Sequence, residues 1–261
     1  MDNYDIIKNM YKMMGLQAGY KLDDKKEFEI VRKTLILNGL PCENFDRNLE
    51  RLVIEKSNIF DYVPSLCKIH VVPGYDNLVH ELFHMASDRD NSGNLGSMYH
   101  RGIGCSLNEG ITDYMSNKAL ADYNMFYIFE AFYYKMLAKM YGGEKILVSH
   151  FNGNVDGVYD TFGDEKRLIL DTTSELDKYT RSAVNSSDAF DRQEYNNMQI
   201  SYDSLVNAFS ELFNIYSYNK DKSYGYMLLI FRTLLEDTFN DEDENRESIY
   251  GKFERKLLKR D

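Results

Sequence analysis

Apolar residues recur every three or four positions along much of this 261-residue chain, which is the spacing that amphipathic helices produce. The spacing predicts helices near residues 5–15, 26–38, 45–56, 107–121, 124–141, 144–151, 154–162, 202–217, 222–238 and 246–259, with part-helical structure over 164–193. Gly39-Leu40-Pro41 should end the second helix, and Gly142-Gly143 the aromatic helix over 124–141. Residues 67–72 are the best strand candidate, and the acidic run 240–245 is predicted to be a solvated linker.

Residues 80–84, His-Glu-Leu-Phe-His, carry the HExxH motif of zinc hydrolases. Positions four apart lie on one face of a helix, so His80 and His84 can bind the same ion while Glu81 stands beside it. Apolar residues flank the motif on both sides, as a buried helix requires. The motif therefore predicts a zinc site in which Glu81 activates a zinc-bound water.

Residues 108–113, Asn-Glu-Gly-Ile-Thr-Asp, put the carboxylates of Glu109 and Asp113 on one helix face. Glu109 is the candidate third ligand, and Asp113 can accept the remaining ring N–H of a metal-bound histidine. Three protein ligands are typical of catalytic zinc, whereas four are typical of structural zinc. The segment also fits a capping box with Ser106 at the N-cap and Glu109 at N3, and that interpretation stays open.

Other side chains compete for the place of third ligand. Asp90 stands where the HExxHxxGxxH pattern puts its last ligand, but Ser87 occupies the position where that pattern needs glycine. Cys67 and Cys105 could supply thiolates, although neither has the paired spacing of a metal site. His100, in a Gly- and Ser-rich stretch over 91–105, is a further candidate.

The two segments together resemble the gluzincin metallopeptidases, the thermolysin-like group, in which HExxH is followed by NExxxD. Residues 107–110, Leu-Asn-Glu-Gly, also resemble the third-ligand helix of the M1-type aminopeptidases, whose GAMEN motif is absent here. The resemblance covers residues 68–120 and implies that residues 68–72 form an edge strand lining the cleft. The roles it implies are zinc binding by His80, His84 and Glu109, general base catalysis by Glu81, and support of the ligands by Asp113 and Asn108.

We expect a mainly α (α+β) fold with a small mixed sheet beside the HExxH helix. Three regions are predicted: a helical N-terminal region (1–65), a zincin-like catalytic core (66–162) and a helical C-terminal region packed on the core (163–261). Residues 1–60 are a candidate for a segment that covers the cleft and keeps the enzyme latent. The loop over 91–105 is either a plain connector or a flap beside the metal.

The composition of the chain limits the expected binding partners and the expected cellular compartment. The net charge of −11 argues against nucleic acid, and no apolar stretch is long enough to span a membrane. Cys42, Cys67 and Cys105 are odd in number and unclustered, which favours reduced thiols over a disulfide scaffold. Because the start also lacks the features of a signal peptide, we expect a cytoplasmic protein, with release by another route left open.

The expected activity is zinc-dependent cleavage of a peptide or protein substrate, by an endopeptidase. Tyr159 is the first candidate for stabilising the oxyanion and His150 the second, followed by His100 and Tyr123. A surface position at a helix end is the plainer interpretation of His150. One alternative is a deformylase-like zinc hydrolase, whose EGCLS-like motif is absent. Another is a binding or regulatory protein that keeps the zinc without turnover, against which the intact Glu81 argues.

Overall fold

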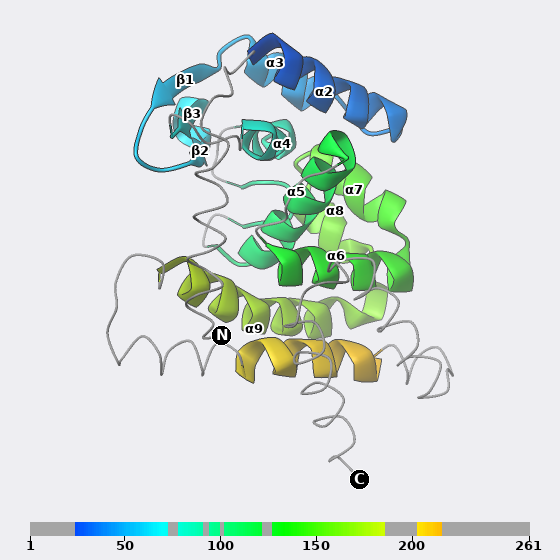
Figure 1. Cartoon of the computed structure of the whole chain (residues 1–261). Helices are drawn as coiled ribbons and strands as arrows, with labels where there is room; N and C mark the ends of the chain where they lie inside the picture. Colours follow the sequence, from blue (N-terminus) through cyan, green and yellow to red (C-terminus); the bar gives the residue numbers. More distant parts are fainter. Residues whose placement is uncertain are drawn as a thin grey trace.

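The computed structural model describes residues 24–72, 78–90, 94–99, 102–121, 127–185 and 203–215, which are mostly helical with one small sheet (Figure 1). The helices are α2 (Asp24–Leu37), α3 (Glu43–Leu49), α4 (Leu78–Ser87), α5 (Cys105–Leu120), α6 (Ile128–Tyr141), α7 (Gly143–Phe151), α8 (Val155–Asp160), α9 (Lys166–Asn185) and a helix over 203–215. The strands are β1 (Val53–Lys56), β2 (Asp61–Val63) and β3 (Lys68–Val71), with 3-10 turns η2 (Pro64–Leu66) and η3 (Gly163–Glu165). A mainly α fold with a small mixed sheet is therefore confirmed.

The sheet has the strand order β1-β3-β2, with β1 parallel and β2 antiparallel to β3. Ile69 and Val71 of β3 are buried while Lys68 and His70 are only half-buried, as expected for a strand with one face on the core. The strand over 67–72 is thus confirmed, but its expected place at the edge is wrong, because β3 is central and β2 is an edge strand.

The predicted helix over 45–56 is wrong in its second half. Helix α3 ends at Leu49, and residues 53–56 form β1, with Val53 opposite Lys68 and Ile54 opposite Ile69. Val53 and Ile54 are β-branched, and pairing with β3 decides their conformation over the helical spacing. The pairing is invisible to a local pattern because it joins residues far apart in sequence.

Gly39 ends α2 as predicted. Its φ is +65°, and its N–H donates to the carbonyl of Ile36 at 3.0 Å, while the N–H of Leu40 donates to the carbonyl of Leu35 at 2.9 Å. These are the two hydrogen bonds of a Schellman motif. Leu35 and Leu40 are both buried, so the turn also anchors α2 in the core, where it contacts α4.

Helix α4 is buried along its whole length, with α2, α3, α5, α7, β2 and β3 packed around it (Figure 1). Its C-terminal end is held by α3, where Asn48 Nδ2 donates to the carbonyls of Met85 (3.0 Å) and Asp88 (2.7 Å). The side chain of Asp88 accepts in turn from the Tyr62 hydroxyl of β2 at 2.7 Å. Both α3 and the sheet therefore fix the helix that carries the HExxH motif.

Helix α5 packs along α6 at a point that only glycine allows. A Cβ at Gly110 would lie 2.1 Å from the carbonyl oxygen of Glu130, far inside a van der Waals contact. Beyond α6 lie α9 and the helix over 203–215, stacked away from the sheet (Figure 1). Gly110 thus sets how closely the segment containing Glu109 can approach the rest of the helical body.

The remaining predicted elements are either confirmed or lie outside the residues that the structure describes. The helices over 26–38, 107–121, 144–151, 154–162 and 202–217 are found with small shifts of their ends, the helix over 124–141 is described from Ile128, and α9 covers 166–185. Residues 5–15, 222–238, 240–245 and 246–259 lie outside the described part. Cys42, Cys67 and Cys105 are free thiols, as predicted. None of the described helices is both long and apolar enough to cross a membrane.

Candidate metal centre

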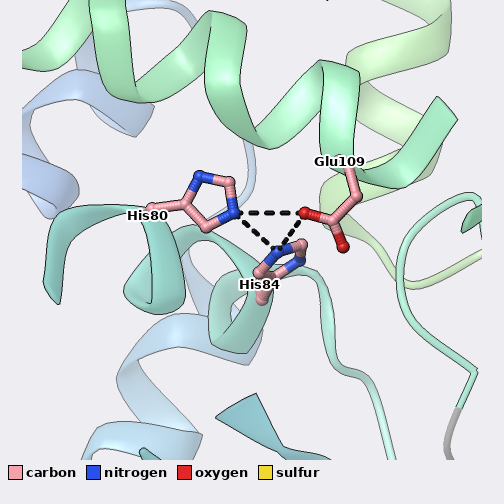
Figure 2. A group of neighbouring side chains, drawn as sticks. All are labelled: His80, His84 and Glu109. Atoms are coloured by element: carbon pink, nitrogen blue, oxygen red, sulfur yellow. Dashed lines mark hydrogen bonds and ion pairs between the residues drawn. The ribbon is translucent and has the colours of Figure 1, made fainter. Parts of the chain in front are cut away.

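Three side chains from two helices converge in the core. Figure 2 shows His80 and His84 of α4 facing Glu109 of α5. The Nε2 atoms of the two histidines are 3.0 Å apart, and Glu109 Oε2 lies 3.2 Å from that of His80 and 3.1 Å from that of His84. Three atoms with lone pairs therefore point at one small volume.

The spacing of these atoms fits a bound ion. Tetrahedral zinc with bonds of about 2.0–2.1 Å keeps neighbouring ligand atoms about 3.3–3.4 Å apart, close to the separations found here. Two imidazoles and one carboxylate suit zinc, and imidazole also suits other transition metals. Among the residues that the structure describes, no fourth His, Cys, Asp or Glu joins this group. Within those residues the group offers three ligands, the number typical of catalytic zinc.

The outer ring nitrogens face polar partners, as metal-bound histidines require. His80 Nδ1 lies 2.8 Å from Asp113 Oδ1, and His84 Nδ1 lies 2.9 Å from Asn108 Nδ2 and 3.3 Å from Thr112 Oγ1. A metal on Nε2 leaves the hydrogen on Nδ1. For His84, the hydroxyl oxygen of Thr112 can accept this hydrogen. Asn108 Oδ1, which has no hydrogen-bond partner among the described residues, can also accept it if the side-chain amide is rotated by 180°. Asp113 and Asn108 thus stand where the sequence predicts them.

The charges of the cluster depend on one another. Burial opposes ionisation of Glu109, but the imidazoles of His84 and His80 lower its pKa well below the usual range. Burial lowers the pKa of His80, yet Asp113 and Glu109 outweigh that and raise it well above 6.5. Without a metal, the ring of His80 is therefore protonated on both nitrogens, with Nδ1 near Asp113 and Nε2 near Glu109. A metal bound at Nε2 of His80 would have to displace a proton, so its binding would weaken as the pH falls.

Glu81 follows His80 on α4, and its carboxyl group is buried, with the residue 5% exposed. Burial is the main cause that raises its pKa, and His80 and His84 oppose the shift. Glu109 and Asp61, an acidic residue of the edge strand β2, raise it further. The carboxyl is thus poised closer to neutral pH than an exposed glutamate.

The capping-box interpretation of Glu109 is wrong. Gly104, not Ser106, is the N-cap of α5, and the Ser106 hydroxyl bonds to Asp177 of α9 at 2.7 Å. Asp90 is exposed and does not belong to the ligand group. Cys67 and Cys105 are also outside that group, and His100 lies outside the residues that the structure describes.

Tyr159 is part of the packing around the loop that follows α4, rather than of the ligand cluster. Its buried hydroxyl donates to the carbonyl of Ser97 at 3.1 Å, and its ring stacks on Tyr99, which itself bonds to Asp156. None of the groups that raise its pKa belongs to the metal cluster. The described parts of the loop are thus anchored to α8 through Ser97 and Tyr99.

His150 is fully buried, so its interpretation as a surface histidine is wrong. Its ring packs against Phe151 and Gly96, and neither ring nitrogen has a hydrogen-bond partner in the described residues. Burial and, less strongly, His84 lower its pKa to about 3, so the ring is neutral. The sequence gives no sign of this burial, because the ring is covered by a glycine from a distant loop. Tyr123 lies outside the described residues.

Tyr127 is the tyrosine that sequence analysis missed. Its ring stacks on that of His80, with centroids 5.8 Å apart and planes at 26°. Its backbone N–H donates to Asp113 Oδ2. The charge of Glu109 is the largest cause that raises its pKa, followed by burial and Glu81. The hydroxyl therefore feels the charges of Glu109 and Glu81 and stays protonated.

No protein-family model matches this chain, and no match was found among curated proteins or solved structures. The sequence motifs and the geometry of the site therefore carry the functional conclusion. The decisive feature is the meeting of HExxH on α4 with Glu109 on α5.

Proposed function

We propose that this chain is a zinc-dependent hydrolase that cleaves peptide bonds, with a zincin-like core and His80, His84 and Glu109 as metal ligands. The observation that carries the proposal is the three-ligand group, with a buried acid beside it on the same helix. When bound, the ion supplies Lewis-acid chemistry, because it polarises a carbonyl and makes water acidic near neutral pH.

Glu81 is the general base in this proposal. It follows His80 directly on α4 and is buried beside the ligands without joining their group. From this position it removes the proton of the attacking water and passes it to the leaving amine. A purely structural site has no use for such a base, which favours a hydrolase over a silent zinc-binding protein.

Tyr127 takes the role for which the sequence suggested Tyr159. The ring of Tyr127 stacks on His80, and its protonated hydroxyl can donate to the oxygen that gains negative charge in the transition state. Asp113 fixes the start of this segment by accepting the N–H of Tyr127. Tyr159 cannot serve in this way while its hydroxyl is bonded to Ser97.

An extended substrate is favoured by the edge strand β2. Among the described residues, β2 pairs on one side only, with β3, and it contacts α4. Its Asp61 is close enough to Glu81 to affect the pKa of that carboxyl. A peptide added along the free edge of β2 would gain backbone hydrogen bonds next to the site. A small-molecule substrate has no peptide backbone to pair with a strand, so this edge favours a peptide.

A digest of a peptide library tests the proposal. The full chain should cleave peptides, lose activity with a chelator and regain it with added Zn²⁺. Glu81→Gln should retain zinc and lose about 10²–10⁴-fold in turnover. No cleavage by protein that holds one equivalent of zinc would contradict the peptidase. Full activity in Glu81→Gln would instead contradict the role of that residue.

A further inference from the structure

The N-terminus of α5 receives no cap from its own segment. The N-cap residue is Gly104, with φ +87° and no side chain to accept a hydrogen bond. The first N–H groups of a helix lack partners within it, and here Ser106 and Leu107 are fully buried. Their partners must come from elsewhere in the fold, since buried unpaired N–H groups are costly.

Asp177 of α9 supplies acceptors for Ser106 and for Gly104, the N-cap residue. Its Oδ2 accepts the N–H of Gly104 at 2.8 Å, while Oδ1 accepts the N–H of Ser106 at 2.8 Å and its hydroxyl at 2.7 Å. The carboxylate is 2% exposed, so water competes little for these donors. Three bonds to one rigid carboxylate fix the first turn of α5 both along and around its axis.

A second contact from α9 holds the chain just before that turn. Arg181 is four residues after Asp177, on the same face of α9, and donates to the carbonyl of Gly102 at 2.7 Å. Gly104 itself is tightly enclosed, since a Cβ there would lie 2.3 Å from the carbonyl oxygen of Ser97. Residues 102–106 are thus held between α9 and the loop that follows α4.

Glu109 lies one helical turn beyond Ser106. Each residue of a helix advances it by about 1.5 Å and turns it by about 100°, so a shift of one residue would point Glu109 away from the histidines. We infer that Asp177 is a positioning residue of the metal centre, because it fixes where α5 presents Glu109 although its own bonds go to Gly104 and Ser106. The inference rests on the proposed metal site.

A double-mutant cycle on the full-length chain tests it. Zinc affinity is measured by competition with a chromophoric chelator for the wild type, Asp177→Asn, Glu109→Ala and the double variant. Asparagine keeps the shape but turns an amide N–H₂ toward one of the donors. Asp177→Asn should weaken zinc binding by about 10-fold or more in the wild type, and by less than about 2-fold in the Glu109→Ala background.

General destabilisation predicts a different result, because it would lower zinc affinity by the same factor in both backgrounds. That outcome, or no loss in the wild type, would overturn the inference. If Asp177→Asn does not fold, Ser106→Ala replaces it in the cycle, because it removes only the hydroxyl that donates to Asp177. Its effect on zinc affinity should likewise be larger in the wild type than in the Glu109→Ala background. The control is Thr172→Val, a buried α9 hydroxyl bonded to Leu168 of its own helix, which should leave zinc affinity unchanged.

The Glu109→Ala variant separates the two levels of the proposal. If Glu109→Ala itself keeps the zinc affinity of the wild type, Glu109 is not a ligand, and both the metal site and the positioning role of Asp177 fail. If Glu109→Ala loses zinc but Asp177→Asn does not, the metal site stands and only the role of Asp177 is overturned.

Discussion

Asp113 holds the backbone N–H of Tyr127 with one carboxylate oxygen while its other oxygen faces Nδ1 of His80, 2.8 Å away. One fully buried side chain thus sets the imidazole of a proposed ligand and the start of the segment that carries the proposed oxyanion donor. Both of its neighbours offer N–H groups, so both of its oxygens are needed as acceptors.

Asp113→Asn should therefore not behave as a conservative change. An amide has one oxygen, so either His80 or Tyr127 would face an N–H₂ group. We expect zinc affinity or turnover to fall by about 10–100-fold, close to the effect of Asp113→Ala. Chelator competition and steady-state kinetics of both variants measure this. An Asp113→Asn protein with wild-type values would mean that a single acceptor suffices.

Glu109→Ala should lose its zinc on dialysis while the protein stays folded, because only the weaker binding by the two histidines remains. The substitution removes one of three proposed ligands. If Glu109 had only capped the helix, its loss would lower helix stability and leave zinc bound, but Glu109 has no capping role in the structure. Metal content after dialysis, together with circular dichroism, measures the outcome. Glu144→Ala, an exposed acid on α7, is the control for loss of charge and should retain the metal.

Tyr127 and Tyr159 should differ when each loses its hydroxyl. Tyr127→Phe should lower kcat by about 10²–10³-fold with little change in melting temperature, as expected for a lost oxyanion donor. Tyr159→Phe should cost about 1–2 kcal/mol of stability, because the carbonyl of Ser97 is left unpaired in the core, and should leave kcat nearly unchanged. The reverse pattern would return the catalytic role to Tyr159.

Glu130 should make stability depend on pH near neutrality. Burial is the main cause that raises its pKa from 4.5 to about 7, against the hydrogen bond from Thr180. The folded state thus keeps a proton that the unfolded chain releases above pH 4.5. This group destabilises the fold progressively as the pH rises from about 4.5 to about 7, and by a constant amount above that.

Glu130→Gln removes the titrating group and keeps a partner for Thr180. In the metal-free protein, the variant should gain stability relative to the wild type as the pH rises, by up to about 3 kcal/mol at pH 8. Urea unfolding at pH 5 and pH 8 in the presence of chelator measures the difference. A gain that is the same at both pH values would mean that Glu130 does not titrate between them.

Much of the proposed site follows from local spacing. His80 and His84, like Glu109 and Asp113, are pairs four residues apart, and a helix brings such pairs to one face wherever it lies in the fold. The helix ends at Gly39 and Gly142 follow from glycine itself. These features need no knowledge of which elements touch.

The parts that the sequence left hidden depend on contacts between distant segments. β1 becomes a strand only because β3 lies beside it, and the same pairing moves β3 from the edge to the centre. Tyr127 reaches the site because Gly110 lets α6 approach α5, and no spacing rule singles it out among 21 tyrosines. The cap on α5 comes from a residue more than 70 positions away.

That last distance has a consequence during synthesis. A ribosome makes the chain from its N-terminus, so the two histidines and Glu109 have all been made long before Asp177 is added. Until then the first turn of α5 lacks the acceptor that its N–H groups bond to in the finished fold. The three proposed ligands are all present once residue 109 has been made, but the inferred role of Asp177 predicts that they are held in place only after α9 has docked, so stable capture of an ion would be a late event in the maturation of the protein.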